Sequence, residues 1–182
     1  CCAILKLGEI NIIQERRLIC LLISHQEILL RLFISMLVGS MLGYERTKAK
    51  KPAGIRTHAL VSLAATMISI VSAYGFYEFR NLAGYTMDPA RLLVGIITGI
   101  GFLGAGIIWK DSNHGDVRGL TTAANIWASA GLGIATGLGH YFLVLSTVSF
   151  MLLALRVSTI LIKIGILKHD EEDMRIFDST RD

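Results

Sequence analysis

The sequence predicts an all-α fold, a polytopic helical membrane bundle with about five transmembrane helices. Of the 182 residues, 53% are hydrophobic and only 18% are charged, a composition too apolar for an ordinary water-soluble domain. The apolar residues gather in charge-poor blocks near the ~17–25 residues that a helix needs to cross a bilayer. The blocks lack the alternation of a transmembrane barrel, and backbone groups in hydrocarbon must be paired internally, so we expect helices.

The five predicted spans cover residues 28–44, 59–76, 92–109, 120–138 and 141–162. Gly139 and His140 separate the last two and predict a tight hairpin. We expect residues 28–162 to form one transmembrane domain and 163–182 a short charged cytoplasmic tail. Residues 1–27 are interrupted by charges before they reach spanning length, and no Met precedes Met36, so we interpret them as an extension that is either a fragment or lies upstream of the native start.

Residues 99–106, GIGFLGAG, contain the G-x-G-x-x-G pattern of dinucleotide-binding folds. That pattern needs a strand before it and a polar loop for the pyrophosphate, whereas here it continues an apolar run. We therefore favour helix packing, because small residues let helices approach closely in lipid. The predicted packing residues are Gly95, Gly99, Gly101, Gly104, Gly106, Asn125 and Gly133.

The distribution of basic residues predicts the orientation. Eleven of the eighteen Lys and Arg lie in the first-to-second loop, the third-to-fourth loop and the C-terminal tail, and five lie on the opposite side. By the positive-inside rule these loops and the C-terminus are cytoplasmic, and the N-terminus lies outside.

Polar residues gather at the predicted cytoplasmic edge, where two helix N-termini could attract a phosphate, a lipid headgroup or a partner's carboxylate. Thr57 and Thr121 are the predicted N-caps. Ordinary topology anchors and caps remain the alternative interpretation. The candidate functional edge is Glu45, Arg46, Arg56, Thr57, His58, Arg118, Thr121 and Thr122, and an external edge holds Asp88 and Arg91.

No residue pattern suggests catalysis, a metal site or a cofactor, and we expect no enzyme activity and no nucleic-acid partner. Cys1, Cys2 and Cys20 have no metal-ligand spacing with the histidines. All fourteen Asp and Glu lie outside the spans or at their edges, which counts against a dedicated Mg²⁺ or H⁺ carrier. The second predicted span carries a polar stripe of Ser62, Thr66 and Ser69. This stripe could nevertheless line a cation path together with the face of the fourth span that carries Asn125.

Four motifs resemble one family. MLGYER (41–46), KPAGIRTHALV (51–61), DPARLLVGIITGIGFLGAGIIW (88–109) and VRGLTTAANIW (117–127), in this order, resemble the MgtC/SapB family of bacterial inner-membrane proteins. The likeness covers about residues 27–157. By position, the family's characteristic residues correspond to Glu45, Arg46, Gly54, Arg56, Thr57, His58, Asp88, Arg91, Gly99, Gly101, Gly104, Gly106, Arg118, Gly119, Thr121 and Trp127.

The resemblance implies a five-helix membrane domain linked to magnesium limitation and to virulence-related functions. It also implies regulation of another membrane complex, including the F-type ATP synthase. Virulence-type members carry a soluble domain after the fifth helix, and Asn125 stands where Thr or Ser is expected, so we favour the SapB-like branch. The first hypothesis is a non-enzymatic modulator in the bilayer, with a homo-oligomer left open. The alternative is a small Mg²⁺ transporter or channel, and a nucleotide-binding enzyme is the third.

Overall fold

The computed structural model describes residues 23–76, 88–110 and 117–163. It contains five helices, α2 (His25–Lys48), α3 (Ile55–Tyr74), α4 (Ala90–Ile107), α5 (Leu120–Gly137) and α6 (Tyr141–Lys163). The two-residue strands β1 (Trp109–Lys110) and β2 (Val117–Arg118) pair antiparallel. The predicted all-α fold is confirmed, and each predicted span is a helix. The first 22 residues and the tail after residue 163 lie outside the described residues.

Three of these helices, α2, α3 and α4, are long and apolar enough to cross a membrane, judged by length and composition. The apolar stretch of α6, Tyr141–Val157, is shorter. The sequence placed the helix boundaries closely, with the largest differences at the α2–α3 connection. There α2 extends to Lys48 rather than residue 44, and α3 begins at Ile55 rather than residue 59.

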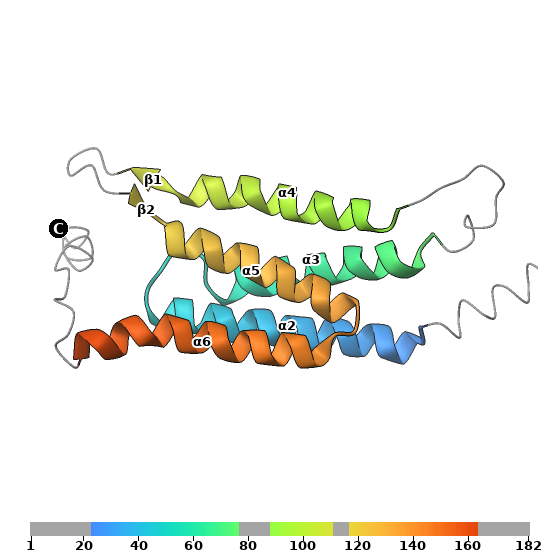
Figure 1. Ribbon diagram of the computed structural model, residues 1–182, viewed down its shortest axis with the longest axis horizontal. Coiled ribbons are helices and arrows are strands. Elements are labelled where there is room, and N and C mark those ends of the chain that lie inside the picture. The colour runs from blue at the N-terminus through green and yellow to red at the C-terminus, as the bar shows by residue number, and fades with distance from the viewer. Residues whose placement is uncertain (1–22, 77–87, 111–116, 164–182) are drawn as a thin grey trace, which may run out of the picture. The chain divides into compact units, whose positions relative to one another are not determined.

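The chain falls into two compact units, residues 1–146 and 147–182. In the first unit α3 contacts α2, α4 and α5, and α5 contacts α2 and α4 as well (Figure 1). The α2–α3 turn and the β1–β2 hairpin lie at the same end of these helices, at the left of Figure 1. The described part of the second unit continues α6 as a single helix.

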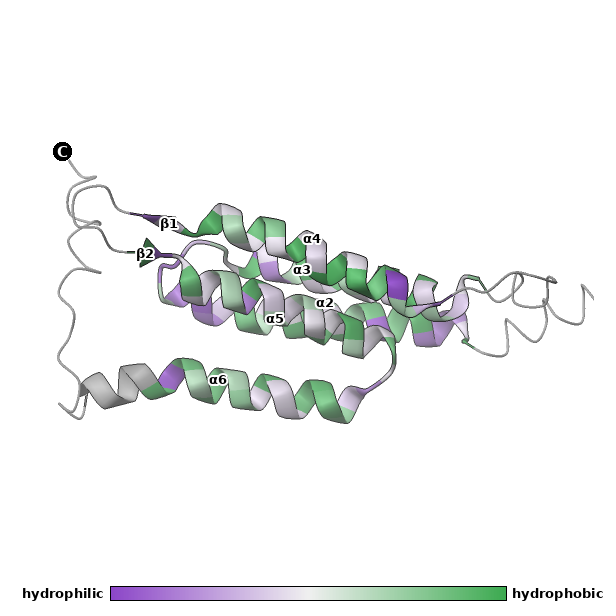
Figure 2. Ribbon diagram, turned by 45° about the horizontal axis from the view of Figure 1, so that its top comes forward, coloured by the Kyte–Doolittle hydropathy of each residue, from purple (hydrophilic) through white to green (hydrophobic). Residues whose placement is uncertain are grey.

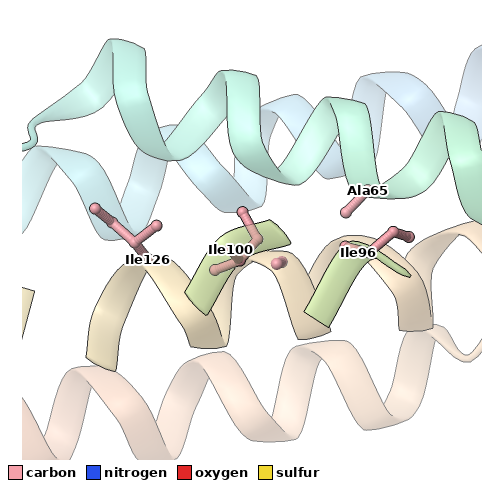
Figure 3. Close-up of a cluster of buried hydrophobic side chains, with 5 residues drawn as sticks. Ala65, Ile96, Ile100 and Ile126 are labelled. Carbon is pink, nitrogen blue, oxygen red and sulfur yellow. The ribbon is translucent and has the colours of Figure 1, made fainter. Parts of the chain in front are cut away.

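A small apolar cluster joins α3, α4 and α5. Ile96 and Ile100 of α4 pack with Ala65 of α3 and with Ile126 and Ala130 of α5 (Figure 3). The rest of α4 is mostly exposed and apolar, as its green colour in Figure 2 shows. Since lipid is as apolar as these side chains, close van der Waals fit rather than escape from water is what holds such a cluster together.

The helix starts differ from the prediction. Ser24 caps α2 by accepting a hydrogen bond from the Glu27 amide at 3.2 Å. The N-caps of α3 and α5 are Gly54 and Gly119, and neither helix has a side-chain cap. The predicted caps Thr57 and Thr121 are therefore wrong, because both helices begin a few residues earlier, at glycines.

Gly119 is required where β2 turns into α5. Its φ of +90° is a conformation that residues with a Cβ rarely adopt, and an added Cβ would overlap the carbonyl of Ile107. This close approach fixes the end of α4 beside the start of α5.

Candidate functional site

The interface of α2, α3 and α5 is polar along much of its length. We call it the polar seam, and its fully buried members are Ser35, Ser62, Thr66, Ser69, Ser129 and Thr136. The Ser35 and Ser62 hydroxyls lie 2.9 Å apart, and Thr66 is 2.7 Å from Ser35 and 2.8 Å from the Gly133 carbonyl oxygen. These hydrogen bonds link three helices. They contribute to helix association in a bilayer, where no hydrophobic effect drives helices together.

Four glycines let the helices of the polar seam pack closely together. A Cβ at Gly39 or Gly43 of α2 would overlap the backbone of α3, and one at Gly133 or Gly137 of α5 would also meet α3. Helix backbones therefore touch directly between the buried hydroxyls. The stripe of Ser62, Thr66 and Ser69 on α3 is packed and hydrogen-bonded rather than lining open space, which is not what a cation path along this face requires.

At one end of the seam, Arg31 joins four helices. Its Nε donates to Glu27 at 2.9 Å, and its Nη1 donates to the Tyr74 hydroxyl at 3.2 Å and to the Gly137 carbonyl at 2.6 Å. The Tyr141 hydroxyl donates to the same Glu27 carboxylate at 2.5 Å. We call Glu27, Arg31, Tyr74 and Tyr141 the Arg31 cluster. The charge of Arg31 is balanced by Glu27, and both its Nε and its Nη1 donate hydrogen bonds, which is the arrangement that makes a buried arginine tolerable.

The opposite end carries a second buried arginine. Arg46 of α2 is 6% exposed, and its Nη2 donates to the Thr122 hydroxyl in the first turn of α5 at 2.5 Å. Arg46 also acts electrostatically on His58 of α3, which is 0% exposed. Asn125, 5% exposed, follows Thr122 by about one turn of α5. We call Arg46, His58, Thr122 and Asn125 the Arg46 cluster.

Three atoms of the Arg46 cluster have no hydrogen-bond partner among the described residues: Arg46 Nε, His58 Nε2 and Asn125 Nδ2. The His58 Nδ1 lies 2.9 Å from the Gly54 carbonyl oxygen, which can only accept, so Nδ1 carries the proton. The neutral ring therefore presents Nε2 as an acceptor. Buried polar atoms without partners are uncommon, because each forfeits its hydrogen bonds to water.

The other predicted edge residues belong to the last turn of α2, the first turns of α3 and α5 and the strand β2, which lie at the same end of the helices (Figure 1). Arg56 and Thr121 are exposed, and Glu45, Thr57 and Arg118 are half-buried. The Arg118 guanidinium lies 5.8 Å from the centre of the Trp109 ring, its partner across the hairpin. The structure thus brings the predicted edge together, with Arg46, His58 and Thr122 as its buried members.

The predicted external edge is built differently. Asp88 accepts a hydrogen bond from the Ala90 amide at 2.9 Å and so provides a partner for one backbone N–H at the start of α4. Arg91 is exposed. Within the described part of the chain, no group of three His, Cys, Asp or Glu could hold a metal ion.

The packing prediction for the α4 glycines needs correction. Only Gly104 approaches a neighbour, with an added Cβ lying 3.6 Å from that of Ala123. Gly95, Gly99, Gly101 and Gly106 have no other described atom within 4 Å of an added Cβ. The reason is that α4 turns its isoleucines, not these glycines, towards α3 and α5.

Asn125 is another of the predicted packing residues. It is buried as expected, but its side-chain amide nitrogen reaches no partner among the described residues. Gly133, by contrast, packs against α3 as predicted.

An apolar groove runs between α3 and α4. Its volume is about 530 Å³, and all its lining residues are apolar. Gly95 and Gly99 lie on the α4 side, and Leu60 and Ala64 on the α3 side. Gly95 and Gly99 therefore border a groove that an apolar group could enter.

Comparison with known proteins identifies the family. The model of the MgtC family matches residues 32–164, which includes the polar seam, the Arg46 cluster and α4. The chain belongs to the MgtC family. It is 40% identical over 151 residues to the protein SapB of Bacillus subtilis, covering 82% of this chain and 65% of SapB. With the apolar helices, family membership makes the chain a membrane protein.

Two further relatives in the MgtC family comparison are enterobacterial. "Putative magnesium transporter YhiD" of Escherichia coli K12 is 39% identical over 116 residues, covering 63% of this chain and 53% of YhiD. Protein MgtC of Salmonella typhimurium LT2 is 38% identical over 113 residues, covering 62% of this chain and 44% of MgtC. The chain thus spans between 44% and 65% of the length of these three relatives. No solved structure matches it.

The sequence interpretation missed the Arg31 cluster. Arg31 lies inside the first predicted span, residues 28–44. The signal was present, because Glu27 and Arg31 are four residues apart, the spacing of an ion pair on a helix. The partners Tyr74, Gly137 and Tyr141 come from three other helices and could not be found from local spacing.

Proposed function

We propose that this MgtC-family protein is a non-enzymatic modulator that contacts an apolar transmembrane helix of another membrane protein through α4. The observation that carries the proposal is the set of unpacked glycines, Gly95, Gly99, Gly101 and Gly106. In a bilayer, an exposed Leu needs no explanation, but an exposed glycine offers lipid little contact. Small residues at helix faces are typical of close helix association.

The groove between α3 and α4 supports a helix as the occupant. It is apolar throughout and contains no charge that would demand a polar ligand. Phe102 is 81% exposed and lies on the same face of α4 as Gly99, three residues away. A partner helix could pack on the glycine backbone while this aromatic ring covers its flank. By family resemblance the F-type ATP synthase is the first partner to test.

Cellular placement is part of the proposal. We place the protein in the bacterial inner membrane, with the α2–α3 turn, the hairpin and the C-terminus in the cytoplasm. The basic residues of the turn and hairpin support this orientation through the positive-inside rule. The open face of α4 would then lie within the bilayer.

The alternative function is Mg²⁺ transport, which the name of YhiD favours. Two observations weigh against it. The hydroxyls of the polar seam are packed against neighbouring helices, and a buried arginine lies at each end of the seam. A positive charge repels a divalent cation, most strongly where water is excluded.

Site-specific photocrosslinking in native membranes tests the modulator proposal. We expect a crosslinker at Phe102 of α4 to capture a membrane protein. The same crosslinker at Phe142 of α6, which is 87% exposed, is the matched control. Gly99→Leu should abolish the Phe102 product while the protein still accumulates, because the added side chain meets open space in this chain.

Three results would sink the proposal: no product at Phe102, capture of a second copy alone, or an undiminished product in Gly99→Leu. Mg²⁺ flux into proteoliposomes containing the folded protein decides the alternative. Saturable uptake that Ser62→Val removes would establish transport along the seam. No uptake by folded protein would remove that alternative.

A further inference from the structure

The Arg46 cluster contains one buried positive charge and three buried hydrogen-bonding atoms that have no described partner. Arg46 Nε, His58 Nε2 and Asn125 Nδ2 belong to three helices and are each at least nine-tenths buried as residues. We propose that this cluster binds a phosphate group with an ionisable P–OH, either that of a phosphomonoester lipid headgroup or free inorganic phosphate. The site is independent of the α4 face, because none of its residues lies on α4.

The electrostatics of the cluster call for an anion. Arg46 is buried, and its one hydrogen bond to a described group goes to a neutral hydroxyl, while the half-buried carboxylate of the adjacent Glu45 acts on it only through electrostatics. The N-termini of α3 and α5 lie at the same end, each with the partial positive charge of a helix start. Neither helix has an acidic residue in its first turn or a side-chain cap. No side chain of these first turns therefore compensates the partial positive charge of the helix start.

The hydrogen-bonding pattern selects a particular kind of anion. Arg46 Nε offers one N–H, and the Asn125 amide offers two. The neutral His58 ring offers the opposite, an acceptor, since Gly54 holds its proton on Nδ1. A complete partner must therefore accept several hydrogen bonds and donate one. A phosphate or phosphomonoester whose second pKa is near 6 does both close to neutral pH, whereas chloride has no proton to donate.

The position of the cluster leaves both sources of phosphate open. Arg46 lies two residues from the end of α2, and Thr122 lies in the first turn of α5. This is the depth at which a bilayer's headgroups begin. Arg56 is exposed at the same end and does not belong to the site.

Thermal unfolding of the full-length purified chain tests the proposal. In phosphate-free detergent we expect sodium phosphate to raise Tm progressively, compared with sodium chloride at the same pH and ionic strength, because a ligand that binds the folded state stabilises it. In nanodiscs we compare phosphatidic acid, a monoester, with phosphatidylglycerol, an anionic diester without an ionisable P–OH. A response to phosphate identifies a soluble source, and one to phosphatidic acid identifies a headgroup.

The variants make the test specific. Asn125→Leu should weaken the apparent affinity at least about tenfold, a loss of about 1.4 kcal/mol. Its Tm without ligand should be equal to or above that of the wild type, because it removes an unpaired buried polar group. Arg56→Gln removes a positive charge from an exposed position outside the site and should leave the response intact.

Asn125→Asp is the second variant, in case Asn125→Leu does not fold. A carboxylate at this position supplies Arg46 with an internal counter-charge and should exclude phosphate from the folded protein. The proposal is overturned if neither phosphate nor phosphatidic acid stabilises the wild type beyond its matched control. It is equally overturned if a folded Asn125 variant responds as the wild type does.

Discussion

Arg31 and Arg46 are both buried on α2, and their surroundings differ in kind. Arg31 has a carboxylate, a phenol and a carbonyl within hydrogen-bonding distance. Arg46 has a single hydroxyl within hydrogen-bonding distance, its Nε reaches no described partner, and the neighbouring Glu45 acts on it only through electrostatics. A buried charge that is fully paired is tolerated for structure, whereas one that is incompletely paired lowers stability and needs another reason to persist. At the scale of the residue, Arg31 is a structural clamp and Arg46 is the functional candidate.

The clamp predicts a stability loss for Arg31→Leu. The change leaves the Glu27 carboxylate without its ion pair and the Gly137 carbonyl without its donor. Glu27 is partly exposed, with a side-chain exposure of 33%, so water recovers some of the loss. We expect a decrease of about 2 kcal/mol in the free energy of unfolding, measured by denaturation in detergent.

Arg56→Leu is the control for that measurement, because it removes the same charge from an exposed position. It should change stability by no more than about 0.5 kcal/mol. Equal effects of the two substitutions would contradict the structural role of the Arg31 cluster.

At the scale of the element, hydropathy was enough to predict each helix in the described part of the chain, because each span is a continuous apolar block. It could not assign the glycines to their neighbours. Gly133 and Gly99 look alike in sequence, yet one touches α3 and the other touches nothing in the described chain. Which face a helix turns inwards depends on its neighbours, and in lipid both faces are apolar. The same limit hid the Arg31 cluster and misplaced the caps of α3 and α5.

Substitution of single glycines by alanine separates the two kinds of face. Gly133→Ala forces a methyl group into the Ser62 backbone and the Ala65 side chain, so it should lower stability by about 1–3 kcal/mol. Gly95→Ala adds a methyl group in open space and gains helix propensity, so Tm should stay level or rise. Thermal unfolding in one detergent compares them directly, and a larger loss for Gly95→Ala would show that α4 is packed otherwise than described.

At the scale of the whole molecule, the two ends of the first unit have opposite characters. One end is closed by the balanced Arg31 cluster. The other gathers the α2–α3 turn, the hairpin and the Arg46 cluster, with Lys48, Lys110 and Arg118 around it. The sequence predicted which residues meet at this second end, because the loops themselves carry the charges. It could not predict that Arg46 is the one arginine of that predicted edge to be buried, since burial follows from the approach of α5.

The difference between the two ends predicts which introduced cysteines react with a thiol reagent from each side of the membrane. In a background with Cys1, Cys2 and Cys20 changed to Ser, Lys48→Cys and Lys110→Cys should react with a membrane-impermeant thiol reagent only in inverted vesicles. Gln26→Cys, exposed at the Arg31 end, should react only in spheroplasts. The physical reason is the preference of basic loops for the cytoplasmic side. Both Lys positions must label together, since the structure places the turn and the hairpin at one end. Reaction of Gln26→Cys in inverted vesicles alone would reverse the orientation and put the Arg46 cluster, with its proposed phosphate site, on the outer face.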